Sequence, residues 1–181
     1  MTVLIVHESM FGNTQAIAEA IAEGMTKELP CGDDPAGGPV VRVVPVTAAP
    51  TEIPDDVSLL LVGAPTHAFS MSRERTRQDA VRQGAAGEAA IGVREWIDRV
   101  VPRSELPVVT FDTRVHVRLL PGSAAKTSAN ALRHRGFHRA ERGESFWVGG
   151  VAGPLSHDEV VRARAWGVAL AGQHLSPAPA S

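Results

Sequence analysis

The chain has 181 residues and a formal net charge of −2, with 44% hydrophobic and 21% charged residues. This length and balance predict one globular domain, and the small net charge argues against bulk binding of nucleic acid or of an anionic membrane. No apolar run approaches the ~20 residues that span a bilayer, and the N-terminus lacks the basic region of a signal peptide. Cys31 is the single cysteine, which excludes an intramolecular disulfide and fits a reducing, cytoplasmic setting.

The first expected unit is a strand, a loop and a helix. Residues 3–6 are a short aliphatic run, typical of a buried parallel strand, and residues 15–25 place their apolar side chains on one helical face. The loop between them, residues 8–14, reads Glu-Ser-Met-Phe-Gly-Asn-Thr. Because the free N–H groups and the dipole of a helix N-terminus both attract anions, this unit predicts an anion site.

The composition of this loop indicates which anion it suits. It is too short for a Walker A motif, it has no lysine, and it lacks the glycine spacing of a dinucleotide fingerprint. It offers hydroxyls and amides, which suit a phosphate monoester. The simpler alternative is that Ser9 and Thr14 serve only as cap and loop residues of the helix.

The next segments predict a break and two strands. Residues 29–39 are rich in Pro, Gly and Asp, which predicts an exposed loop in which Cys31 has no chemical role. Residues 40–46 form the second strand, and Pro45 places it at the edge of the sheet. Residues 57–63 are the most apolar run, which predicts a central third strand.

The loop expected at residues 64–72 follows the central strand. Ligands of open α/β sheets bind beyond the carboxyl ends of the strands, at the point where the winding reverses, so this loop should face residues 9–14. His67 and Phe69 offer planar faces to a ligand; the alternative is a solvated His67 and a Phe69 packed in the core. Three arginines follow within residues 73–77, either on a solvated helix face or positioned to bind a second anionic group.

The remaining elements alternate in the same way. We expect a helix at 89–100 with Trp96 packed inside, a fourth strand at 106–112, and a helix at 123–135 capped by Ser123. Two extended pieces on either side of a turn at residues 142–143 predict a fifth strand ending near 148. A last helix at 156–171, capped by Ser156, completes a single domain over 1–175, and residues 176–181 predict a flexible tail.

The loop at 9–14 resembles the phosphate-binding loop of the flavodoxin family. Ser9, Gly12, Asn13 and Thr14 match that loop in type and position, whereas Met10 and Phe11 replace hydroxyl residues. The order of the elements resembles the family over nearly the whole chain. The resemblance implies an α/β, flavodoxin-like three-layer sandwich with a five-stranded parallel sheet of order 2-1-3-4-5, and flavin mononucleotide (FMN) as cofactor.

The resemblance also implies the residues of the cofactor site. The 5′-phosphate would bind the side chains of Ser9, Asn13 and Thr14 and the backbone N–H groups of Met10 to Thr14. The flavin ring would lie between the loops that follow the third and fourth strands, and the residues implied there are Pro65, Thr66, His67, Ala68, Phe69, Asp112, Thr113 and Arg114.

The second ring loop departs from the family in its chemistry. Family members usually place a Tyr and acidic residues there, whereas this chain has no Tyr and carries Arg114, His116 and Arg118. Because arginines favour an anionic reduced flavin that acidic loops disfavour, we expect a higher potential for the fully reduced couple than in a typical acidic flavodoxin.

Three functions are compatible with these features. The first is an FMN protein that transfers electrons with a redox partner protein. The second is an FMN-dependent NAD(P)H:quinone-type oxidoreductase, in which the arginines of residues 73–77 would receive a nicotinamide dinucleotide phosphate. The third is a flavodoxin-like interaction module without flavin, which the missing Tyr and the change at Met10 and Phe11 leave open.

Overall fold

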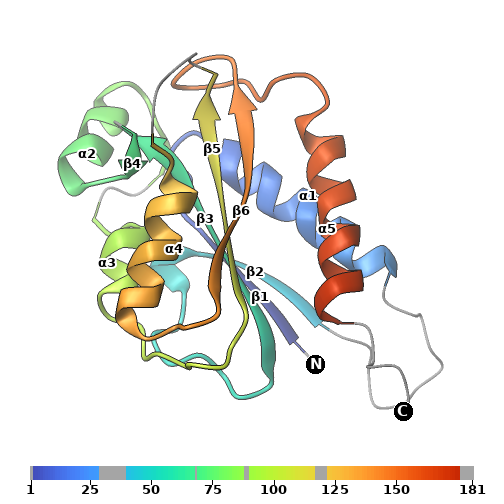
Figure 1. Cartoon of the computed structure of the whole chain (residues 1–181). Coiled ribbons are helices and arrows are strands. Elements are labelled where there is room, and N and C mark those ends of the chain that lie inside the picture. The colour runs from blue at the N-terminus through green and yellow to red at the C-terminus, as the bar shows by residue number, and fades with distance from the viewer. Residues whose placement is uncertain (1, 29–39, 68, 88–89, 117–121, 176–181) are drawn as a thin grey trace, which may run out of the picture.

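The computed structural model describes residues 2–28, 40–67, 69–87, 90–116 and 122–175. Its centre is a parallel sheet of five strands in the order β2-β1-β3-β5-β6 (Figure 1). The strands are β1 (Thr2–His7), β2 (Val40–Pro45), β3 (Val57–His67), β5 (Val108–Val115) and β6 (Ala140–Val148). This confirms the predicted fold class and strand order, including the edge position of the strand that contains Pro45.

Helices cover both faces of the sheet and make three layers (Figure 1). One face carries α1 (Asn13–Glu28) and α5 (Glu159–His174), and the other carries α2 (Glu74–Arg82), α3 (Val93–Ile97) and α4 (Ala124–Arg135). A 3-10 turn, η1 (Val46–Ala48), follows β2. The two faces bury separate hydrophobic clusters, as expected where aliphatic strands are covered on both sides.

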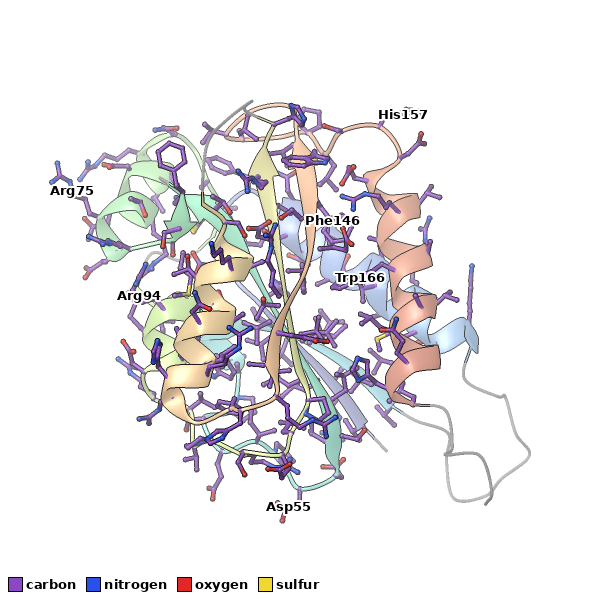
Figure 2. All side chains as sticks on the ribbon, viewed as in Figure 1. Asp55, Arg75, Arg94, Phe146, His157 and Trp166 are labelled. Atoms are coloured by element: carbon purple, nitrogen blue, oxygen red, sulfur yellow. The ribbon has the colours of Figure 1, made fainter. Side chains whose placement is uncertain are left out.

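Aromatic side chains fill both clusters. On the α1/α5 face, the rings of Phe111, Phe146 and Trp166 pack together, with centroids 5.9–6.4 Å apart. Figure 2 labels Phe146 and Trp166 of this cluster. On the other face, Trp96 is buried and its Nε1 donates to the Pro50 carbonyl at 3.0 Å, which confirms its packing role. No helix within the described residues is long and apolar enough to cross a membrane.

The end of β3 differs from the sequence-based expectation. The segment expected as a loop at 64–72 continues β3 to His67 and then pairs with a short antiparallel strand, β4 (Ser70–Met71). The antiparallel pairs Thr66–Met71 and His67–Ser70 continue β3 beyond Pro65, its last residue paired with β5. The site loop is therefore a hairpin, which fixes the backbone of His67.

Three further boundaries were wrong. The helix expected at 89–100 is only five residues long, because the chain enters it at Gly92 in an extended conformation. The turn expected at 142–143 is absent, and β6 absorbs one extra residue as a register shift opposite residues 110–112. Helix α5 starts at Glu159, after an Asp158 with φ 65°, and not at the expected Ser156 cap. By contrast, Ser123 caps α4 as predicted and accepts from the Lys126 N–H.

Some sequence-based predictions lie outside the described residues. These are the loop at 29–39 with Cys31, the ring-loop residue Ala68, the basic residue Arg118 and the tail at 176–181.

Candidate functional site

A cleft opens at the carboxyl ends of β1, β3 and β5, beside the loop that joins β1 to α1. It encloses about 270 Å³. In a sheet of this order the winding direction reverses between β1 and β3, so the cleft occupies the position where open α/β sheets bind their ligands. The candidate site is therefore built around residues 9–14.

The backbone of this loop presents a row of hydrogen-bond donors. Within the described part of the chain, the N–H groups of residues 10–14 have no protein acceptor. The next two are satisfied, since the Gln15 N–H donates to Ser9 Oγ at 3.2 Å and the Ala16 N–H donates to the Gly12 carbonyl at 3.0 Å. Five consecutive donors at the N-terminus of a 16-residue helix have the chemistry to accept an anion.

Gly12 leaves the space in front of these donors open. Its φ is +83°, and a Cβ added there would meet no described protein atom within 4 Å. A side chain at this position would therefore occupy space that the fold itself does not use. The donor row and this open space together fit a phosphate group.

Two side chains of the loop form hydrogen bonds with residues outside it. The hydroxyl oxygens of Thr14 and Thr113 lie 2.7 Å apart, and the Asn13 amide donates to the Ala152 carbonyl at 3.2 Å. Gly153, whose φ of +98° favours glycine, lies against this amide, and a Cβ there would come within 2.7 Å of it. In the threonine pair one hydroxyl donates and the other keeps its hydrogen for a further acceptor. The side chains of Asn13 and Thr14 thus anchor the loop to neighbouring elements.

The structure brings most of the predicted site residues together. Ten of them line the cleft: Ser9, Met10, Phe11, Asn13, Thr14, Pro65, Thr66, His67, Thr113 and Arg114. Gly12 contributes backbone only. Burial lowers the pKa of His67, with a further contribution from the charge of Arg77, so the imidazole is neutral at pH 7. A neutral imidazole offers one donor and one acceptor nitrogen to the cleft.

Two predicted ring-loop residues do not line the cleft. Phe69 has φ 68° and is 48% exposed, outside the cleft wall. Asp112 is fully buried below it, where Oδ2 accepts from the Thr66 hydroxyl at 2.9 Å and from the Ala125 N–H at 3.0 Å. Asp112 therefore supports the β3 hairpin and the start of α4.

Aromatic and basic side chains meet at the end of β5 and β6. The guanidinium of Arg114 lies over the ring of Trp147, 5.6 Å from its centroid, and the His116 ring packs edge-on against the same indole at 4.8 Å. An Arg–Trp contact therefore stands next to the cleft. Arg114 and Trp147 are direct neighbours across the sheet, which sequence order alone does not show.

Helix α2 supplies cleft residues that sequence reasoning missed. Thr76, Asp79 and Ala80 of α2, with Gln83 at its C-cap, line the cleft at the spacing of one helical face. Val115, Val148 and Val151 line it as well. The spacing on α2 was visible in the sequence, but nothing in the sequence indicated which face of the helix meets the site.

The arginines of residues 73–77 do not form the second anion site that was one expectation for them. Arg77 is fully buried, with Nη1 donating to Ser72 Oγ at 2.9 Å and Nη2 paired with Glu95 at 3.1 Å. Glu8, directly before the loop, is buried beside it and accepts from the Val93 N–H at 2.8 Å. Burial raises the pKa of Glu8, although Ser72, Val93 and Arg77 favour its charged form. The three guanidiniums at 73–77 therefore do not act together at the cleft.

Comparisons with known proteins agree with this geometry at the level of the fold. No family model and no curated protein sequence matches the chain. Among solved structures, a flavodoxin from the domain Archaea matches with a TM-score of 0.61 and 16% identity, over 97% of this chain and 100% of that one. The two-electron-reduced flavodoxin of Megasphaera elsdenii matches with a TM-score of 0.58 and 18% identity, over 94% and 98%.

A longer protein shares the same unit. The flavodiiron protein of Giardia intestinalis matches with a TM-score of 0.57 and 17% identity, over 96% of this chain but 36% of its own length. Strand order, helix layers and the position of the cleft lead to the same conclusion as these matches. The chain has the flavodoxin-like fold.

Proposed function

We propose that this protein binds FMN in the cleft and transfers electrons. The observation that carries the proposal is the row of five N–H groups at residues 10–14, which opens into the cleft at the N-terminus of α1. Such a row, aligned with the helix dipole, binds a phosphate monoester. The open space at Gly12 supports the same ligand, because the fold leaves it clear of side chains.

The rest of the cleft supports a flavin over a smaller phosphate compound. Apolar groups of Pro65, Val115, Val148 and Val151 form much of its wall, and His67 and Arg114 add polar groups near them. Its volume, about 270 Å³, is close to the lower end of the roughly 300–1,000 Å³ found for ligand pockets.

The protein's own residues would bind and tune the cofactor. When bound, FMN supplies the redox chemistry by accepting electrons and passing them on. The N–H groups of residues 10–14 would hold its phosphate, His67 would present a neutral imidazole, and Arg114 would place positive charge beside the reduced form. We expect a redox partner protein as the source or acceptor of the electrons.

The decisive experiment is cofactor binding. We expect purified protein to be yellow, and colourless protein to quench the fluorescence of added FMN in a saturable manner. Riboflavin, which lacks the phosphate, should bind at least about tenfold more weakly, because the donor row would lose its anion. Colourless protein that leaves FMN fluorescence unchanged would contradict the proposal and favour a flavin-free interaction module.

NADPH separates a carrier from a reductase. The reductase alternative depended on the arginines of residues 73–77, and the buried Arg77 leaves Arg73 and Arg75 as the exposed members. We therefore expect no bleaching of bound flavin within minutes of mixing with NADPH under anaerobic conditions. Rapid bleaching would instead establish the NAD(P)H-dependent activity.

A further inference from the structure

One face of α2 forms a polar wall of the cleft beside the phosphate loop. Thr76, Asp79, Ala80 and Gln83 follow the spacing i, i+3, i+4, i+7, and all four line the cleft. Gln78, on the same helix, does not line the cleft, and its Nε2 donates to Glu74 on the surface. The wall is therefore a specific face of α2.

Two of these side chains have polar atoms that no described residue engages. The Thr76 hydroxyl is engaged, since it accepts from the Arg73 N–H and donates to the Arg73 carbonyl, both at 2.9 Å. Asp79 uses Oδ1 for a 2.7 Å contact with Arg82. Asp79 Oδ2 and the Gln83 side-chain amide make no hydrogen bond to any described residue. They supply hydrogen-bond acceptors and an NH₂ donor.

The fold holds this wall firmly beside the loop. Arg77 connects α2 to Ser72 and Glu95 in the interior, and a Cβ on Gly92 would lie 2.5 Å from its Nη1. After α2 the chain returns to the phosphate loop, where the Gly87 N–H donates to the Met10 carbonyl at 3.0 Å. The α2 face thus has a fixed position relative to residues 9–14.

The charges of the phosphate loop and of the α2 wall define which ligand fits between them. An anion belongs at the donor row, whereas the Asp79 carboxylate disfavours a second anion at α2 and favours groups that donate hydrogen bonds. FMN has this distribution, because an uncharged chain of hydroxyl groups joins its phosphate to the ring.

We propose that Asp79 and Gln83 on α2 bind the hydroxylated chain of the flavin and so determine ligand specificity. This inference rests on the proposed function. The phosphate loop recognises one end of the ligand, and α2 recognises the neutral part that follows. The two contributions are separable, because riboflavin keeps the hydroxylated chain and lacks the phosphate.

The test compares dissociation constants of FMN and riboflavin, measured by fluorescence quenching, for three variants. Gln83→Ala should weaken both ligands by the same factor, about three- to tenfold, which is the effect of one lost hydrogen bond. Asp79→Ala should weaken riboflavin more than FMN, because the lost carboxylate also relieves repulsion of the phosphate. Gln78→Ala changes the same residue type at a position that does not line the cleft, and should leave both constants unchanged.

The outcomes separate this inference from the proposed function. If Gln83→Ala and Asp79→Ala both bind FMN and riboflavin with dissociation constants within twofold of the unaltered protein, α2 does not have this role. The proposal that the protein binds FMN would still stand. An effect of Gln83→Ala on FMN alone also overturns the role of α2, since the contact would then be with the phosphate. Failure of the unaltered protein to bind either flavin overturns the proposed function, and the α2 inference falls with it. Circular dichroism confirms that each variant is folded.

Discussion

The hydroxyl oxygens of Thr14 and Thr113 lie 2.7 Å apart and are both buried, so the first turn of α1 is bonded directly to β5. Thr14→Val leaves the Thr113 hydroxyl buried without this partner, and should lower the free energy of unfolding by about 1–3 kcal/mol. Thr113→Val should do the same. The double variant should lose less than the sum, because two apolar groups then meet. Urea denaturation of the four proteins measures the coupling, and strictly additive losses would contradict it.

Gly12→Ala tests the phosphate cradle. With φ at +83°, alanine should cost about 1–2 kcal/mol of stability, and its methyl group enters the open space in front of the donor row. FMN binding should weaken more than tenfold, while riboflavin binding changes little. Gly84→Ala is a matched control, because Gly84 has φ +89° and similarly open surroundings outside the cleft wall. Equal effects of both variants on FMN binding would mean that backbone strain alone is responsible.

Glu8→Gln tests the buried carboxyl before the loop. Burial raises the pKa of Glu8 above 4.5, so the folded chain favours the protonated form. As the pH rises from about 4.5 through the folded pKa, the unfolded chain loses its proton first, and the unaltered protein loses stability relative to the variant. Urea denaturation at several pH values should therefore show the two stability curves diverging towards neutral pH. Parallel curves would contradict this, and the exposed Glu74→Gln serves as control.

Arg77→Met tests the attachment of α2. The guanidinium is fully buried and pairs with Glu95 at 3.1 Å, so its removal leaves buried polar groups without their cation. The free energy of unfolding should fall by about 3 kcal/mol. Arg75→Met, two residues away and exposed, should change it by less than about 0.5 kcal/mol. Similar denaturation midpoints for the two variants would show that Arg77 contributes no more than a surface residue.

Arg114→Gln tests the electrostatics of the proposed cofactor site. Arg114 lines the cleft and lies over the Trp147 ring. Removing its charge should destabilise the anionic, fully reduced flavin and lower the potential of that couple in a potentiometric titration. Arg75→Gln should have a smaller effect, because its charge is exposed to solvent and screened. An unchanged potential in Arg114→Gln would remove the electrostatic basis for a potential above that of acidic flavodoxins.

The sheet and the loop at residues 9–14 were predictable because local signals determine them. Pro45 excludes a central position, and the apolar run from Val57 identifies the middle of the sheet. Ser, Gly, Asn and Thr between a strand and a helix indicate an anion site without any long-range information. These features depend on residues that are neighbours in sequence.

The interior polar contacts were not predictable from local patterns. Arg77 belongs to a charged run, which in most chains is a solvated helix face, yet its partners Ser72 and Glu95 enclose it. The β3 hairpin likewise depends on pairing with Ser70–Met71, in a segment that lacks a strand-like pattern. The contacts of Arg77 determine which face of α2 meets the cleft. The spacing of residues along α2 could not predict this by itself.

The hydrogen bond between Asp112 and Thr66 constrains how the protein can evolve. The same carboxylate oxygen accepts from the Ala125 N–H, and the Thr66 oxygen accepts from the Ala124 N–H at 2.9 Å. If either side chain is lost, the other side chain loses a hydrogen-bond partner. A backbone N–H at the start of α4 loses its acceptor as well. The two positions should therefore covary among descendants of this sequence, with single replacements rare at either one, even though Asp112 does not line the cleft.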